Sequence, residues 1–507
     1  MAGVVSSNNT KTIKDVSFIA FILVYTAALI FLCLRLNVSN DEIFSLDTTS
    51  NNLAGVIRQS YNFEGQPPAY FILLSLWRKI SFDVFFARLF SVMFVALSAF
   101  VFSKFVKLMS GEPCSRWLII IFLLNPYTVW TALEVRLYSF VLFISLTSVY
   151  YLLRYYISKK NKYLYIFVFT CLVGLYTQYL YVYLVASLAV PVLLFKGWKE
   201  FFKYCLFTLP VGLLLLHNLW ITTDPMSLAY INSVSNTLTE RMMLVFHSPQ
   251  NLVLGMHMLV VARILRWVFL LLFLALAGYT YIKWFREKKL TNTIYFKSLN
   301  GVLISGAIMI AINSVFFAVT KLDYHDRYLT IAFPLFMSPF ILFQVYPLVK
   351  RSIIFGTMSV LYAAMLLVQY RYQVKEYDTR SLTKYIGVIE RKSEPILFYH
   401  KVLSLQFKYN YTGQNPLVPL PDGLRFDSSY LSKIQDTIGL RNAIEQANPV
   451  SPSYLLITDR SEPIFENDPD IKILNSYLPT RYNVTLDTIF AGNNEYFPLR
   501  IRRLEKK

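Results

Sequence analysis

The chain has 507 residues, of which 55% are hydrophobic, 17% aromatic and only 16% charged, with a formal net charge of +19. Soluble domains carry about 25% charged residues and stop enlarging one core at roughly 250–300 residues, so a soluble, disordered or collagen-like protein is excluded. The composition indicates an integral membrane protein with many spans, in which the positive balance reports loop topology and not a nucleic-acid partner.

Eleven apolar runs define the predicted spans. They lie at 17–36, 83–103, 117–133, 137–153, 163–177, 178–195, 204–221, 259–282, 299–319, 329–346 and 352–370. Because about 20 apolar residues cross a bilayer, we expect a polytopic α-helical protein with about 11 transmembrane helices. As one helix, the stretch 163–195 would be about 50 Å long, so we expect two short spans that break near Tyr176–Tyr179.

Basic residues cluster in every second loop along these runs. This positive-inside pattern predicts an inner (plasma) membrane protein whose N-terminus is cytoplasmic and, with eleven spans, whose C-terminus lies outside. Residues 1–370 form the predicted membrane domain. Residues 371–507 lose the long apolar runs and show strand-like pieces, Pro395–Tyr399 and Tyr454–Thr458, that alternate with helical candidates such as 428–447. This alternation predicts a C-terminal extracytoplasmic α/β domain.

The predicted outer side has two long loops, 37–82 and 222–258, and long loops on a rigid scaffold commonly hold binding groups. Asp41 and Glu42 directly follow the first span. Partial desolvation at that boundary suits a carboxylate general base. Further along the first loop, Asp47 and Glu64 are interpreted as solvated loop residues.

The same loop ends in a short apolar segment, Ala69–Ile80, which follows two prolines. Its length of about 12 residues is too short to cross a bilayer, so we expect an interfacial or re-entrant helix that begins at the prolines.

Two short outer turns also carry charge. Glu134 and Arg136 lie where the third and fourth runs meet, and they form either a structural ion pair or part of a functional site. His325 and Arg327 lie in the turn before the tenth run, where an arginine can hold a phosphate through two hydrogen bonds. The histidines show no metal-ligand spacing, and no glycine-rich phosphate-binding motif occurs.

Several of these motifs occur in an order that resembles a known superfamily. They are Asp41-Glu42, Gln66-Pro67-Pro68-Ala69-Tyr70-Phe71, Arg88, Asn125-Pro126 and Glu134-Val135-Arg136-Leu137-Tyr138. The chain resembles the GT-C superfamily of membrane glycosyltransferases and is similar, over about residues 17–350, to its bacterial protein-mannosyltransferase-like (glycosyltransferase family 39-related) group. Gln66 and Gln178 replace histidines that are usual in that group, which argues against acid–base or metal roles at these two positions.

The resemblance implies an inverting glycosyltransferase. Such an enzyme moves a sugar from a polyprenyl-phosphate carrier to a glycan, lipid or protein acceptor outside the cytoplasm. Asp41 is the expected base, with Glu42 second, and no metal or other cofactor is expected. The candidate substrate- and phosphate-binding residues are Arg58, Gln66, Glu134, Arg136, Tyr138, His325 and Arg327. Alternatives that stay open are a transporter or flippase for a lipid-linked glycan, an O-antigen polymerase or ligase-like enzyme, and a non-catalytic membrane subunit.

Overall fold

The computed structural model describes residues 3–221, 263–287, 294–320, 326–345, 350–375, 377–399, 401–420, 437–447, 451–459, 469–493 and 498–507. The loop 222–258 and His325 lie outside these residues. Its contacts divide the chain into two compact units. The helical unit comprises Met1–Leu34 and Thr48–Gln369, and the sheet unit comprises Arg35–Asp47 and Tyr370–Lys507.

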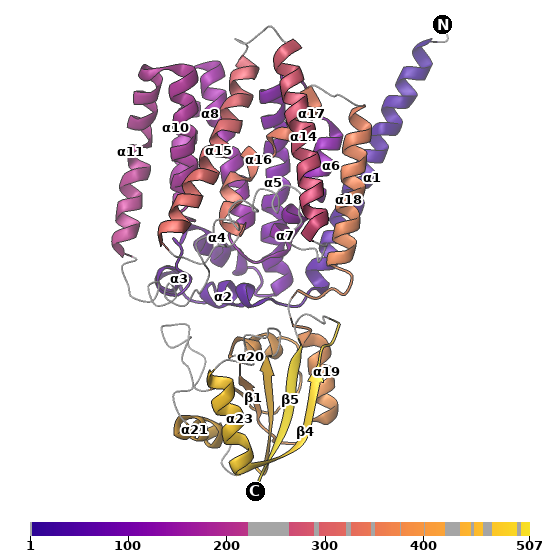
Figure 1. The fold of residues 1–507 in the computed structure, drawn as a ribbon, viewed down its shortest axis with the longest axis vertical. Coiled ribbons are helices and arrows are strands. Elements are labelled where there is room, and N and C mark those ends of the chain that lie inside the picture. Colours follow the sequence, from indigo (N-terminus) through magenta and orange to yellow (C-terminus); the bar gives the residue numbers. More distant parts are fainter. Residues whose placement is uncertain are drawn as a thin grey trace. The chain divides into compact units, whose positions relative to one another are not determined.

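The helical unit contains a helix at each of the eleven apolar runs (Figure 1). Its elements are α1 (Gly3–Arg35), α3 (Leu53–Asn62), α4 (Ala69–Arg78), α5 (Val84–Ser110), α6 (Arg116–Leu124), α7 (Pro126–Leu133), α8 (Tyr138–Ser158), α9 (Asn161–Leu175), α10 (Tyr181–Lys196), α11 (Trp198–Ile221), α14 (Arg263–Glu287), α15 (Ile294–Thr320), the 3₁₀ helix η2 (Asp326–Ala332), α16 (Phe333–Phe336), α17 (Ser338–Val345) and α18 (Arg351–Gln369). Within the described ranges, seven candidate spans are long and apolar enough to cross a bilayer, or eight if the bent pair α6 and α7 counts as one. The polytopic helical class is therefore confirmed.

The third apolar run is broken where its sequence requires it. Pro126 has no backbone N–H and its ring collides with the preceding turn, so α6 ends at Leu124. Asn125 then caps α7, because its Oδ1 accepts hydrogen bonds from the N–H groups of Tyr127 (2.9 Å) and Thr128 (3.3 Å). The two helices are bent by 57°, which turns α7 away from the direction of α6.

The stretch 163–195 forms two helices, as expected. The helices α9 and α10 are separated by the turn Tyr176–Leu180. They pack closely, since a Cβ atom on Gly174 would lie 2.5 Å from the ring of Tyr181. The hydroxyl of Tyr181 is hydrogen-bonded to Ser148 on α8 at 2.7 Å. The tenth run is instead divided into η2, α16 and α17, and most of it is buried, which is where irregular backbone is tolerated in a membrane protein.

Polar side chains fix the beginning of α5 and its position against α1. Asp83 caps α5 by accepting a hydrogen bond from the N–H of Phe85 at 2.7 Å. One turn further, Arg88 is almost fully buried and its Nη1 donates to the backbone oxygen of Cys33 at 2.9 Å. This bond satisfies a carbonyl near the end of α1 that no helical N–H would reach.

The sheet unit has a five-stranded sheet in the order β2-β1-β3-β5-β4. Its elements are α2 (Asn40–Thr48), which begins in this unit, α19 (Thr379–Ile389), β1 (Ile396–Tyr399), α20 (Lys401–Lys408), β2 (Leu417–Leu420), α21 (Thr437–Ala447), β3 (Ser453–Asp459), α23 (Pro469–Arg481), β4 (Tyr482–Phe490) and β5 (Leu499–Lys506). Strands β2, β1 and β3 are parallel, and β5 is antiparallel to β3 and β4. The predicted α/β class is confirmed.

Alternate strand residues face two separate cores. Leu397 and Leu456 pack with α21 and α23 on one face, whereas Phe398 and Leu455 pack with α19 and α20 on the other. Figure 1 shows α23 and α19 on opposite faces of the sheet. The continuous apolar runs of β1 and β3 follow from this arrangement, because a strand covered on both faces needs no polar side.

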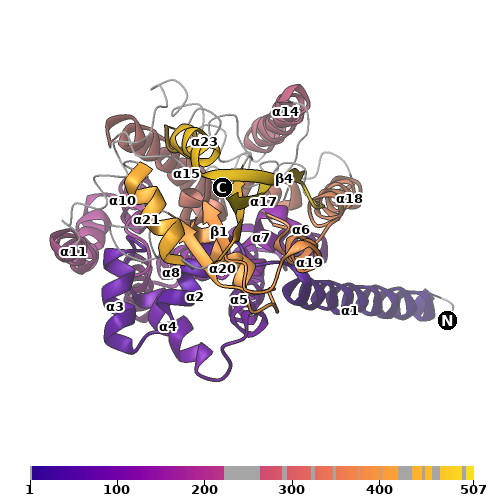
Figure 2. The same ribbon diagram turned by 90° about the horizontal axis from the view of Figure 1, so that it is seen from below.

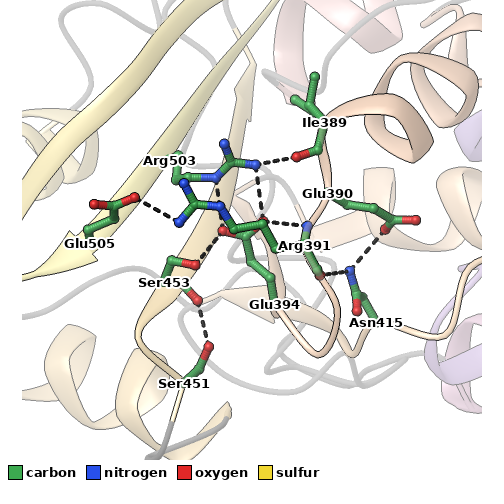
Figure 3. Close-up of polar contacts among 9 residues, drawn as sticks. All are labelled: Ile389, Glu390, Arg391, Glu394, Asn415, Ser451, Ser453, Arg503 and Glu505. Carbon is green, nitrogen blue, oxygen red and sulfur yellow. Dashed lines mark hydrogen bonds and ion pairs between the residues drawn. The ribbon is translucent and has the colours of Figure 1, made fainter.

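A buried carboxylate joins the loop before β1 to two strands of this sheet (Figure 3). Glu394 is 1% exposed, and its Oε1 accepts hydrogen bonds from Nε of Arg503 at 3.0 Å and from Oγ of Ser453 at 2.6 Å. Its Oε2 accepts the backbone N–H of Arg391 at 3.2 Å. The loop before β1 is thereby fixed to β3 and β5, with the buried charge paired as its desolvation requires.

Candidate functional site

The turn between α7 and α8 carries two buried charged residues, Glu134 and Arg136. The hydroxyl of Ser91 donates to the backbone oxygen of Glu134 at 2.6 Å and so fixes the turn to α5. Nη1 of Arg136 donates to Oε2 of Glu64 at 2.6 Å, and the side chain of Glu64 is only 2% exposed. Glu64 is therefore a buried partner of Arg136, and its interpretation as a solvated loop residue was wrong.

Two glutamines lie on loops that are hydrogen-bonded to each other. The N–H of Ala69, three residues after Gln66, donates to the backbone oxygen of Tyr176, two residues before Gln178, at 2.9 Å. The Oε1 atoms of Gln66 and Gln178 are both buried and accept no hydrogen bond in the described part of the chain. A buried acceptor without a donor costs about 1–3 kcal/mol, so these two oxygens are suited to a ligand that brings hydroxyl donors.

Tyr61 on α3 lies at the same two loops. Burial and a hydrogen bond with Tyr176 raise the pKa of its phenol well above the usual range, so Tyr61 stays neutral. Helix α3 packs against α4, the helix that begins at Ala69 (Figure 2). The helix expected at Ala69–Ile80 is thus present, and it holds the Gln66 loop against the α9–α10 turn.

Tyr138 and Arg327 are connected through an aromatic run. The ring of Tyr138 lies 5.3 Å from that of Trp130, which lies 5.4 Å from that of Tyr127. The hydroxyl of Tyr127 is hydrogen-bonded to Oγ1 of Thr330, which itself donates to the backbone oxygen of Arg327 at 2.6 Å. The start of η2 is therefore held beside the start of α8.

Contacts within the helical unit thus join several expected site residues. Arg136 and Tyr138 belong to one turn, Gln66 lies two residues after the Glu64 that pairs with Arg136, and Arg327 is linked to Tyr138. Arg58 is different, because its side chain is exposed on α3. Glu64 is a residue that sequence reasoning missed, although its place beside the Gln66-Pro67-Pro68 motif was a signal.

Asp41 and Glu42 lie in the first turn of α2, within the sheet unit. Ser39 and Glu42 form a capping box: the N–H of Ser39 donates to Oε2 of Glu42 at 3.1 Å, and the N–H of Glu42 donates to Oγ of Ser39 at 3.4 Å. The fully buried Glu42 also pairs with Nζ of Lys375 at 2.9 Å. Asp41 is half-buried, and its carboxylate lies at the positive end of the helix dipole.

Amide side chains fix this segment further within the sheet unit. Nδ2 of Asn37 donates to the backbone oxygen of Tyr377 at 2.7 Å, while Oδ1 of Asn37 accepts the N–H of Lys375 at 2.8 Å. Nε2 of Gln406 donates to Oδ1 of Asn40 at 2.8 Å. The segment that carries Asp41 and Glu42 is therefore built into the fold of the C-terminal unit.

Comparisons of this chain with known proteins give information about its fold. No family model matches the chain, and no curated protein sequence matches it. Among solved structures, it is similar to the crystal structure of ArnT from Cupriavidus metallidurans in the apo state, with a TM-score of 0.58 and 12% identity over 97% of this chain and 98% of that chain. ArnT from the same organism bound to undecaprenyl phosphate aligns with a TM-score of 0.38 and 10% identity over 95% and 98% of the two chains. The first match confirms the predicted fold class, because this chain shares the fold of that ArnT structure.

Proposed function

We propose that this protein is an inverting glycosyltransferase that moves a sugar from a polyprenyl-phosphate carrier to a cell-envelope acceptor. The observation that carries the proposal is the likeness to ArnT, a GT-C family glycosyltransferase, over nearly the whole of both chains. The motif order from Asp41-Glu42 to Glu134–Tyr138 supports it from the sequence. In this proposal the reaction takes place on the extracytoplasmic side of the inner membrane and the N-terminus is cytoplasmic.

Asp41 is the proposed base. In the reaction, an acceptor hydroxyl attacks the anomeric carbon on the face opposite the carrier, its proton passes to the carboxylate, and the bond from the anomeric carbon to the phosphate oxygen breaks. Asp41 is placed for this role in the first turn of α2. Glu42 is fully buried, whereas Asp41 is half-buried and can be reached by an acceptor, which supports Asp41 over Glu42.

Arg136 is the proposed partner of the departing phosphate. Its guanidinium is held by Glu64, so it is preorganised for an anion whose negative charge grows as the bond to carbon breaks. Arg327 is a second candidate for that phosphate. Gln66 and Gln178 provide buried amide oxygens for donor hydroxyls, in keeping with a neutral, hydroxyl-rich group such as a sugar.

The test uses the full chain in lipid nanodiscs with a panel of labelled polyprenyl-phosphate hexoses and pentoses and an extract of envelope glycans, lipids and proteins. The labelled sugar is expected to appear on an acceptor, and the amount of labelled sugar on the carrier should fall. Asp41→Asn should lower that turnover by about 10²–10⁴-fold. Asp83→Asn is the control, because asparagine caps α5 as well as aspartate does.

Two outcomes would contradict the proposal. Wild-type turnover by Asp41→Asn would remove Asp41 as the base. Label that crosses the bilayer of a proteoliposome while it stays on its carrier would make the protein a transporter.

A further inference from the structure

A groove on the helical unit lies far from Arg136, Tyr138 and the other candidate site residues. It is an open groove between α8, α10 and α15. Tyr156 lies about 27 Å along α8 from Tyr138, close to the thickness of a bilayer core. The groove is therefore at the opposite end of α8 from the Glu64–Arg136 pair, and nothing in the proposed reaction uses it.

The lining of the groove is apolar along most of its length and basic at one end. Leucine, valine, proline and phenylalanine side chains form the walls, and the charged lining residues are Lys196, at the end of α10, and Lys297, near the start of α15. Among the described residues, no carboxylate lines the groove. The two ammonium groups at one end of this apolar groove are suited to bind a ligand with an anionic head group and a hydrocarbon tail.

The charges around Lys196 strengthen this match. Nζ of Lys196 and Nζ of Lys159 each lie 5.4 Å from the ring centre of Tyr156, so two cations lie close to one aromatic ring. A nearby carboxylate is that of Glu200, whose Oε1 pairs with Lys159 at 2.9 Å and whose Oε2 accepts the hydroxyl of Tyr155 at 3.0 Å. The local balance is positive, and a ligand phosphate would offset it.

The helices that form the groove are packed tightly beside it. A Cβ atom on Gly301 would lie 3.3 Å from Cβ of Pro191, and the hydroxyl of Ser305 donates to the backbone oxygen of Ser187 at 3.2 Å. Since α10 and α15 are fixed by these contacts, the groove is a stable feature of the fold and does not depend on a moving loop.

We propose that this groove binds an anionic phospholipid of the bilayer, with its phosphate between Lys196 and Lys297 and an acyl chain along α8, α10 and α15. Basic pockets between transmembrane helices at a membrane surface recognise anionic head groups in this way. The site is separate from the sugar donor site and does not depend on the proposed reaction. Its occupant would stabilise the α8–α10–α15 packing.

Native mass spectrometry of the delipidated full chain in a neutral detergent tests the proposal, with phosphatidylglycerol and phosphatidylcholine as the added lipids. The wild type should retain one phosphatidylglycerol at concentrations where phosphatidylcholine does not bind. The double variant Lys196→Gln/Lys297→Gln should bind phosphatidylglycerol at least about tenfold more weakly. Lys104→Gln/Lys107→Gln is the matched control, because it removes two exposed lysines near the end of α5 and away from the groove.

Two further measurements test the proposal: competition by small phosphates and comparison of lipid affinities. Glycerol phosphate and inorganic phosphate should not displace the lipid, because they lack the chain that the apolar walls bind. Equal affinity of the wild type and the Lys196/Lys297 variant for phosphatidylglycerol, with the melting temperature retained, would overturn the proposal. Equal binding of the two lipids by the wild type would overturn it as well, even if the variant failed to fold.

Discussion

Nη1 of Arg136 and Oε2 of Glu64 lie 2.6 Å apart, although the two residues are separated by 72 positions in the chain. The pair joins the loop before α4 to the turn between α7 and α8. Both side chains are almost fully buried, so each charge depends on the other for compensation.

Arg136→Met should leave Glu64 buried without its cation. We expect a loss of about 3–5 kcal/mol in the free energy of unfolding, measured by thermal or chemical unfolding in detergent. The double variant Arg136→Met/Glu64→Met should regain much of this stability yet still bind the polyprenyl-phosphate carrier weakly. Arg351→Met is the control, because its pair with Glu112 is exposed and should contribute only about 0–1 kcal/mol. Wild-type carrier affinity in the double variant would leave Arg136 a purely structural residue.

Variants of the Glu42–Lys375 pair test whether Glu42 is a structural carboxylate or the catalytic base. Glu42→Gln should destabilise the protein by about 3–5 kcal/mol because it leaves Lys375 without its anion, although glutamine can still complete the capping box with Ser39. Glu42→Gln/Lys375→Met should recover stability and keep turnover per folded molecule within about threefold of wild type. If this double variant were as inactive as Asp41→Asn, the base would be Glu42 instead.

Gln178→Leu should lower the turnover of the enzyme without lowering its stability. It removes a buried oxygen that accepts no hydrogen bond in the described residues, so stability should stay unchanged or rise by about 1 kcal/mol. Turnover should fall at least about tenfold if that oxygen accepts a donor hydroxyl. The control is Gln344→Leu, since Gln344 accepts from the N–H of Ser115 and donates to the oxygen of Pro113, and its loss should cost about 1–3 kcal/mol. A drop in melting temperature for Gln178→Leu as large as for Gln344→Leu would contradict the interpretation.

Gly174→Ala should disturb the packing of α9 against α10. The new methyl group would lie about 2.5 Å from the ring of Tyr181, whose hydroxyl is fixed by Ser148, so the ring has no easy way to move. We expect a loss of about 1–3 kcal/mol. The new methyl group of Gly212→Ala on α11 would meet no atom of the described residues within 4 Å, so this variant should be neutral or slightly stabilising. Equal melting temperatures for the two variants would show that the α9–α10 contact is looser than described.

The sequence by itself determined the class of the protein and the positions of its elements. Apolar runs mark helices, Asn125-Pro126 breaks one of them, and the length of 163–195 requires a break near Tyr176, because each signal acts within a few residues. The apolar strand pieces in the last third of the chain predicted an α/β unit for the same reason.

The tertiary structure alone decided which charged groups are partners. Nothing local identifies Glu64 as the partner of Arg136 or Lys375 as the partner of Glu42. The sequence also does not show that Lys196 and Lys297 lie together at one end of a groove. A loop carboxylate and a buried one have the same local sequence signal, and their difference arises only when distant segments remove water from around them. For the same reason, hydropathy placed Asp41 and Glu42 at the end of the first span, whereas the contacts of Asn37, Asn40 and Glu42 placed them in the sheet unit.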